Sequence, residues 1–221
     1  MKDTYLGFTQ LRQEETEGRD YRIRLRKADS NIAVLAPHGG GIEPGTAEVA
    51  DAIADGDYTF YAFQGLKPSG NRTLHLTSVR FDEPVGVQAA RAAEIAVTVH
   101  GCRDQGETVF VGGRGGAWQL RMLQSLQDAG FEARITHTPE RAGRRLSNLC
   151  NRCRSGEGVQ LELSLGLRKR LLVPLYRTAA RRRTDRFSLF VGSVRQAMRG
   201  AEFGSLAVRP DRWGPAARPL G

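Results

Sequence analysis

The sequence predicts an α/β protein, a single domain with a mixed, mostly parallel sheet flanked by helices. Short continuous apolar runs, typical of strands buried on both faces, recur along the chain. Segments with helical spacing of apolar residues lie between these runs, and such alternation favours a layered sheet with parallel neighbours. The length of 221 residues suits one domain. We expect it to span residues 1–208 and the stretch 209–221, which contains three prolines, to form a loose tail.

The first half of the chain contains four expected strands and one helix. Residues 21–25 alternate apolar and arginine side chains, which suits a half-buried strand or an edge ribbon. The run 32–36 has the composition of a strand buried on both faces, and a helix is expected over 44–54, with proline at its start. Residues 58–63 and 74–78 are β-prone segments separated by a loop rich in Gly, Pro, Ser and Asn.

The second half repeats the alternation of strands and helices. Glycines follow several of the apolar runs, and a glycine also ends one of the helical patterns. In chain order we expect a helix over 84–93, strands over 95–99 and 108–113, a helix over 118–126, strands over 131–136 and 159–164, and a helix over 188–200.

The charge balance favours an acidic partner. The formal net charge is +9, which suits nucleic acid, a phosphorylated surface or a polycarboxylate substrate. No apolar run approaches the ~18 residues that a membrane-spanning helix needs. The N-terminus lacks the apolar core of a signal peptide, so we expect a cytoplasmic protein that does not bind membranes, and we expect it to be a monomer.

Three side chains near the ends of predicted strands suggest a metal site. His38 follows one buried strand, Glu43 lies at the start of the next helix, and His100 ends a second buried strand. Functional groups gather beyond the carboxyl ends of strands in open α/β sheets, and two imidazoles with one carboxylate are a ligand set of catalytic zinc. The alternatives are capped surface histidines or a phosphate-binding turn at glycines 39–41. Neither the P-loop nor the dinucleotide-binding glycine pattern is present.

Glu162 has the properties of a fourth functional residue. It lies on the polar face of a predicted strand, between Gln160 and Ser164. Acidic residues are disfavoured within strands, although an outward-facing charge on an edge strand is an equally good interpretation. A zinc hydrolase needs a carboxylate that takes a proton from water, and Glu162 is our choice for that role.

Several motifs together resemble the poly-γ-glutamate hydrolases, zinc-dependent enzymes associated with phages of bacteria that produce this polymer. The motifs are APHGGGIEPGT at 36–46, VHG at 99–101 and GVQLELS at 158–164, and the resemblance covers roughly residues 5–200. It implies an α/β fold similar to the zinc carboxypeptidases, one Zn²⁺ per chain and a polyanionic substrate, poly-γ-glutamate. An alternative substrate is another carboxylate-bearing amide.

The resemblance also assigns residues to roles. It implies His38, Glu43 and His100 as the zinc ligands and Glu162 as the general base. The roles that it leaves open are the stabilisation of the oxyanion and the binding of substrate carboxylates. We select Arg152 to stabilise the oxyanion. For binding the substrate carboxylates we select Asn151, Arg80, Arg168 and His75. The alternative for each arginine is a solvated position on the surface.

A basic stretch and a pair of cysteines lie outside these motifs and are interpreted separately. The stretch 168–186 holds eight basic residues against one acidic residue, which favours a non-enzymatic, phage-related nucleic-acid-binding protein as the rival function. It lacks the interleaved aromatic residues on which single-strand binders stack bases. Cys150 and Cys153 form a CxxC pair without a second pair nearby, so we expect free, packed thiols.

Overall fold

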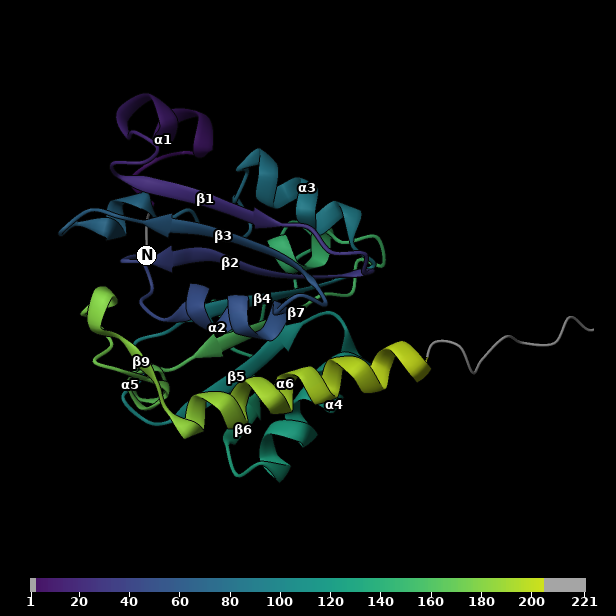
Figure 1. The fold of residues 1–221 in the computed structure, drawn as a ribbon. Coiled ribbons are helices and arrows are strands. Elements are labelled where there is room, and N and C mark those ends of the chain that lie inside the picture. Colours follow the sequence, from purple (N-terminus) through teal and green to yellow (C-terminus); the bar gives the residue numbers. More distant parts are fainter. Residues whose placement is uncertain (1–2, 205–221) are drawn as a thin grey trace, which may run out of the picture.

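The computed structural model of the chain describes residues 3–204, with side chains described up to residue 199. Its centre is a seven-stranded sheet with the strand order β1-β3-β2-β4-β7-β5-β6 (Figure 1). The strands are β1 (Tyr21–Arg26), β2 (Ile32–Gly40), β3 (Thr59–Gly65), β4 (Ile95–Gly101), β5 (Thr108–Gly113), β6 (Glu132–Ile135) and β7 (Val159–Leu163). A two-stranded ribbon, β8 (Leu172–Val173) with β9 (Arg182–Arg183), lies outside this sheet.

The sheet is mixed and mostly parallel, as predicted. Strands β3, β2, β4 and β7 run parallel to one another, and so do β5 and β6. The two antiparallel contacts are β1 with β3, where β1 forms the expected edge, and β5 with β7. The carboxyl ends of β2, β4 and β7 therefore meet at one edge of the sheet.

Helices cover both faces of the sheet (Figure 1). The sheet has a hydrophobic core on each face. Odd-numbered residues of β4 and β7 point into the first core, which they form with α2, α4, α5 and α6. The second core packs α1, α3 and the short helices η1 and η2 against the opposite face. Since side chains alternate along a strand, the even-numbered His100 and Glu162 lie on the opposite face. The helices are α1 (Phe8–Glu14), α2 (Thr46–Ala54), η1 (Asn71–Leu74), α3 (Pro84–Ala92), α4 (Gly116–Asp128), η2 (Leu149–Arg152), α5 (Leu165–Leu171), η3 (Thr178–Ala180) and α6 (Asp185–Gly204).

Most of the predicted elements are confirmed; one predicted strand is absent, and helices α1 and α5, the three short helices and the β8–β9 ribbon were not expected. The segment 74–78 is not a strand, because its polar groups bind the N-terminal residue Asp3 instead of a neighbouring strand. Helix α1 was not expected in the polar N-terminal region. The predicted tail at 209–221 lies outside the described residues. No helix in the described part of the chain is both long and apolar enough to cross a membrane.

Candidate active site

A bulge in β2 determines where His38 points. Ala36 faces the core formed with α2, and strict alternation would direct His38 to the same side. The pairing of β2 with β3 shifts register between Ala36 and Gly39, and such an extra residue redirects the side chains that follow. The ring of His38 therefore lies on the face of His100, stacked on His75 with ring centroids 4.1 Å apart.

Glu43 returns to the same point from the loop between β2 and α2. The loop turns at Gly40, whose φ of +63° and close approach to the Gly65 carbonyl exclude a side chain. The backbone N–H of Glu43 then donates to the carbonyl oxygen of His38 at 2.9 Å. A carboxylate oxygen of Glu43 accepts a hydrogen bond from the backbone N–H of Gly101 at 2.8 Å, which joins the loop to the end of β4.

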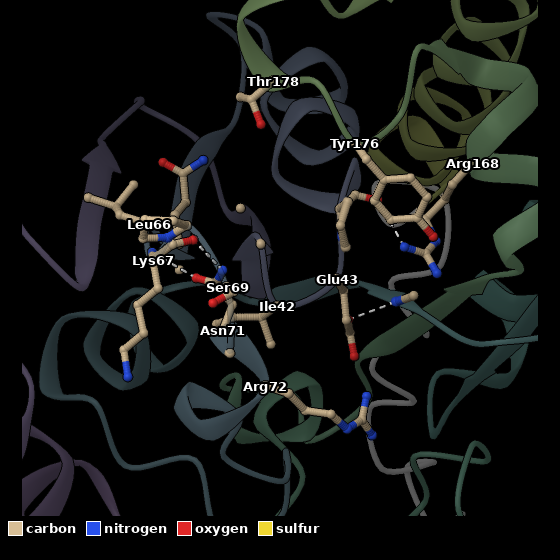
Figure 2. A pocket seen from close by; sticks show the side chains of 18 of the residues that line it. Ile42, Glu43, Leu66, Lys67, Ser69, Asn71, Arg72, Arg168, Tyr176 and Thr178 are labelled. Atoms are coloured by element: carbon tan, nitrogen blue, oxygen red, sulfur yellow. Dashed lines mark hydrogen bonds between the residues drawn. The ribbon is translucent and has the colours of Figure 1, made fainter.

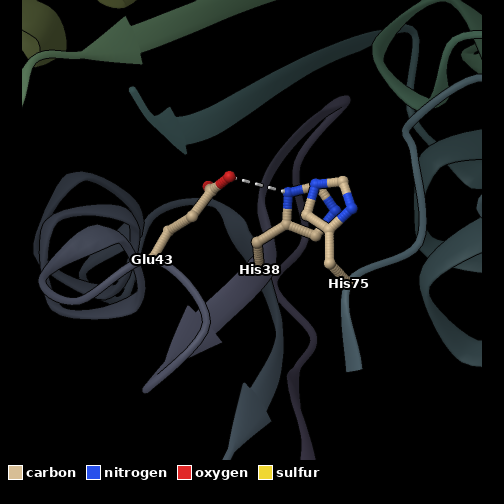
Figure 3. A group of neighbouring side chains, drawn as sticks. All are labelled: His38, Glu43 and His75. Atoms are coloured by element: carbon tan, nitrogen blue, oxygen red, sulfur yellow. Dashed lines mark ion pairs between the residues drawn. The ribbon is translucent and has the colours of Figure 1, made fainter. Parts of the chain in front are cut away.

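Two ring nitrogens and the two oxygens of one carboxylate face one another at this point. The Nδ1 atoms of His38 and His100 lie 3.1 Å apart, and the Glu43 carboxylate lies 3.3 Å from the first and 3.8 Å from the second. His38, Glu43 and the stacked His75 also offer ligand atoms within 4.8 Å of one another (Figure 3). The other ring nitrogen of His38, Nε2, donates to the carbonyl oxygen of Leu76 at 2.8 Å, since a carbonyl only accepts.

The cluster is buried, and its charges are strongly coupled. Burial lowers the pKa of His38, but the Glu43 carboxylate outweighs this effect and raises it. Burial raises the pKa of Glu43, yet the histidines, His38 foremost, lower it to about 2. Burial and the charge of His38 lower the pKa of His75 to about 4 and that of His100 to about 3. The Glu43 carboxylate therefore favours a positive charge on His38 and the neutral form of the other two rings.

Glu162 lies next to this cluster. It is the register partner of His100 in the pairing of β4 with β7, and it lines the same cavity of about 420 Å³. Gln160 donates a hydrogen bond to its carboxylate at 3.1 Å. Burial and then the charge of Glu43 raise the pKa of Glu162 well above its usual range. A buried carboxyl group of this kind is poised for proton exchange.

Arg168 is almost completely buried, although it borders a cavity, and its guanidinium binds groups of the protein itself. Its guanidinium donates to the carbonyl oxygens of Pro44 at 2.9 Å, Cys102 at 2.8 Å and Leu163 at 3.2 Å. Those carbonyls follow Glu43, His100 and Glu162 closely in the sequence. A side chain on Gly101 would come within 2.6 Å of the guanidinium carbon, which explains glycine at this position. Arg168 thus fixes three segments relative to one another.

His75 and Arg80 meet at Asp3. His75 lines the cavity of the cluster, and its Nδ1 lies 2.9 Å from the Asp3 carboxylate. Arg80 donates to the other Asp3 oxygen at 2.7 Å and is itself partly exposed at the surface. The structure therefore brings His75 directly to the site and connects Arg80 to it through one carboxylate.

The structure does not bring Arg152 or Asn151 to the cluster. The guanidinium of Arg152 donates to the carbonyl oxygens of Ser147, Val79 and Phe81. These bonds hold it away from the cavity that the cluster lines. The expected role of Arg152 at the oxyanion has no support in this geometry. The side-chain amide of Asn151 donates to two carbonyls of the segment 143–145, so it shapes the wall of the cavity from behind.

Two arginines that were not predicted as site residues also line the cavity. Arg144 and Arg145 are exposed and lie at the same cavity as His38, Glu43 and Glu162. Nothing in their local sequence distinguishes them from other surface arginines. They reach the cavity because Asn148 and Asn151 fold the loop back over β7, where Asn148 donates to Gln160 at 3.0 Å.

A second, larger cavity of about 930 Å³ adjoins the cluster, and Glu43 lines both cavities. Figure 2 shows Glu43 between Arg168 and Arg72, with Lys67 on the opposite side of this cavity. The charge of Arg103 contributes to a lowered pKa of Arg72, although burial has the larger effect. The basic residues that line this cavity are Arg22, Lys67, Arg72, Arg103, Arg168 and Arg181.

The arginine-rich stretch 168–186 does not form one continuous basic face. Arg168 is buried, and Arg181 pairs with Glu48 and the carbonyl of Leu175. Arg183 and Arg186 lie over the rings of Phe187 and Phe131, with 4.9 and 4.0 Å to the ring centroids. In these contacts the guanidinium groups bind other parts of the protein and do not add to a shared basic surface. The three cysteines are free and buried, as expected for packed thiols.

A protein-family model matches most of the chain. The family model described as poly-gamma-glutamate hydrolase matches residues 5–193. Among curated proteins, the UPF0714 protein YndL of Bacillus subtilis is 36% identical over 171 residues, which are 77% of this chain and 67% of YndL. The SPbeta prophage-derived UPF0714 protein YoqZ of the same organism is 34% identical over 170 residues, 76% of this chain and 61% of YoqZ.

Solved structures show the same similarity. A bacteriophage poly-gamma-glutamate hydrolase superposes with a TM-score of 0.86 and 32% identity, covering 93% of this chain and all of that chain. A structure described as zinc-free apo YndL also has a TM-score of 0.86, with 33% identity over 90% of this chain and 99% of that one.

Proposed function

The chain belongs to the poly-gamma-glutamate hydrolase family, enzymes that act on γ-glutamyl amide bonds, and on that premise we propose that it cleaves poly-γ-glutamate with one zinc ion. In this proposal His38, Glu43 and His100 hold the zinc and Glu162 is the general base. The observation that carries it is the convergence of two Nδ1 atoms and one carboxylate within 3.8 Å.

The donor set fits a zinc ion on chemical grounds. Ligands at about 2.0–2.1 Å in a tetrahedron lie roughly 3.3 Å from one another. The two Nδ1 atoms are 3.1 Å apart and Oε1 of Glu43 lies 3.3 Å from His38, close to that value, while Oε2 of Glu43 lies 3.8 Å from His100. Because His38 donates through Nε2 to Leu76, its Nδ1 carries the lone pair when the ring is neutral. Two lone pairs and a carboxylate that face one another repel unless a cation or a proton lies among them.

His100 is preferred to His75 as the third ligand for two reasons. Its Nδ1 lies 3.1 Å from Nδ1 of His38 and 3.8 Å from the Glu43 carboxylate, and its backbone neighbour Gly101 is bonded to that carboxylate. The Nδ1 of His75 already faces Asp3. We assign His75 a contact with the substrate instead.

The chemistry then divides among these residues. Bound zinc lowers the pKa of a water molecule toward ~7 and polarises the amide carbonyl. Glu162 takes a proton at its carboxylate and delivers it to the departing nitrogen. Arg144 and Arg145, at the mouth of the same cavity, replace Arg152 as our choice for stabilising negative charge on the carbonyl oxygen.

The larger basic cavity suits the remainder of the polymer. Poly-γ-glutamate carries one free carboxylate per residue, and arginines bind carboxylates through two parallel hydrogen bonds. Arg72 and Arg103 line this cavity beside Glu43, so a chain that reaches the cluster passes these cations. The cytoplasmic location and monomeric state expected from the sequence stay predictions.

Metal analysis and hydrolysis assays test the proposal. We expect one zinc per chain in the wild type and in His75→Ala, but none in His38→Ala or His100→Ala. Glu162→Gln should keep its zinc and lose at least about 100-fold in hydrolysis of poly-γ-glutamate, the size of a general-base contribution. A chelator should abolish activity, and zinc should restore it. Stoichiometric zinc that persists in both His38→Ala and His100→Ala would refute the ligand set.

A further inference from the structure

Asp3 makes an unusual set of contacts for a residue so close to the N-terminus. Its side chain is only 1% exposed. One oxygen lies 2.9 Å from His75 Nδ1 and accepts from the Thr77 hydroxyl at 2.9 Å. The other accepts from the Thr77 backbone N–H at 2.9 Å and from Arg80 at 2.7 Å. The match to the family model begins at residue 5, so Asp3 precedes it.

These contacts define the state of His75. Both oxygens of Asp3 already receive hydrogen bonds from groups that donate, as an ionised carboxylate does. The nitrogen of His75 that faces Asp3 must then carry the proton, which leaves Nε2 as the acceptor of the neutral ring. His75 is stacked on His38 in this orientation and lines the cavity that Glu162 also lines.

We propose that Asp3 is a positioning residue that holds His75 in the Nδ1–H tautomer, so that His75 Nε2 accepts a hydrogen bond from the substrate amide. The substrate contact rests on the proposed function, whereas the link between Asp3 and His75 rests on geometry alone. The arrangement follows a general pattern, in which a carboxylate on one imidazole nitrogen determines what the other nitrogen does.

Asp82 provides a matched control for the N-terminal segment. Its carboxylate accepts from the backbone N–H of Phe8 at 2.6 Å and thus anchors the same segment. It lies against Gly7 and lines a different cavity from the cluster. Asp82→Asn replaces a charged acceptor with a neutral one and so weakens this anchor, without a direct change at His75. A purely structural role of Asp3 predicts equal effects of the two substitutions.

The test combines nitrogen NMR of the His75 ring with kinetics on zinc-loaded protein. We expect the Nδ1–H tautomer in the wild type and in Asp82→Asn, and loss of that single state in Asp3→Asn. Asp3→Asn should also lower kcat/KM by about 10–100-fold, as other residues that orient a site side chain do, at unchanged zinc content. In a His75→Ala background, Asp3→Asn should cause no further loss.

Three outcomes would overturn the inference. They are an unchanged His75 tautomer in Asp3→Asn, an equal kinetic loss in Asp82→Asn, and a full additional loss from Asp3→Asn in the His75→Ala background. A wild-type protein without hydrolytic activity would instead refute the proposed function and the substrate contact. The tautomer measurement, made on that same protein, would still decide the link between Asp3 and His75.

Discussion

Replacing Arg168 with methionine removes the group that joins the three segments of the site. Methionine fills much of the same volume but cannot donate to the carbonyls of Pro44, Cys102 and Leu163. The Leu163 carbonyl also accepts from the backbone N–H of Cys102 at 2.9 Å, so it keeps one partner. The other two lose the guanidinium, at about 1–3 kcal/mol for each buried carbonyl. Part of this cost is offset because the buried charge is removed as well.

We therefore expect Arg168→Met to lower the free energy of unfolding by about 3 kcal/mol, a large part of the ~5–15 kcal/mol typical of a domain. Urea-induced unfolding followed by tryptophan fluorescence measures this difference. Arg170→Met is the matched control, because Arg170 lies on the same helix and contacts Glu107 at 3.1 Å at an exposed position. Its effect should stay within about 0.5 kcal/mol.

Zinc affinity gives a second measurement on the same variants. The carbonyls that Arg168 binds follow Glu43, His100 and Glu162, so loosening them should weaken zinc binding in Arg168→Met and leave it unchanged in Arg170→Met. If Arg168→Met does not fold, Arg168→Lys retains the charge with fewer directed donors and should fall between the two. Equal unfolding free energies for Arg168→Met and Arg170→Met would refute the reasoning.

Two further predictions concern stability. The pKa of Asp51 is lowered because Arg26 and Arg24 outweigh the effect of burial, so its ion pairs stabilise the fold above its ordinary pKa of 3.8 and lose this effect as the pH falls through the lowered value. The urea midpoint of Asp51→Asn should be below that of the wild type at pH 6 and approach it by pH 3; a constant difference would contradict this. Phe190 is fully buried against the edge of Phe131, at 5.3 Å between ring centroids. Phe190→Ala should cost about 3–5 kcal/mol in thermal or urea unfolding, and a cost under about 1 kcal/mol would argue against a rigid core.

The strands were predictable because their signals are local. The runs at 32–36 and 95–99 contain the apolar side chains that both cores require, and the structure buries both completely. The direction of the His38 side chain was not predictable in this way. Alternation from Ala36 points it to the wrong face, and only the register shift against β3 corrects this. No single-strand pattern contains that information.

The positions of the arginines were not predictable from the sequence either. Arg168 lies among Lys169 and Arg170 in the sequence, yet it is buried whereas its neighbours are exposed. Its position depends on carbonyls from three distant segments, which composition cannot indicate. Arg152 also looks like a surface cation in the sequence, but its partners are the carbonyls of Ser147, Val79 and Phe81. Charge counts predict a basic protein and leave open which cations face a cavity.

The buried thiol of Cys150 offers a way to measure how often one wall of the active-site cavity opens. It lies behind the loop that carries Arg144 and Arg145, with its Sγ 3.9 Å from the carbonyl oxygen of Gly143. Burial raises its pKa, so the thiol is both shielded and poorly nucleophilic while the loop is packed. A thiol reagent can reach it only when this loop separates from β7. The alkylation rate of Cys150 therefore reports how often that wall opens by local unfolding, under conditions in which the rest of the protein stays folded.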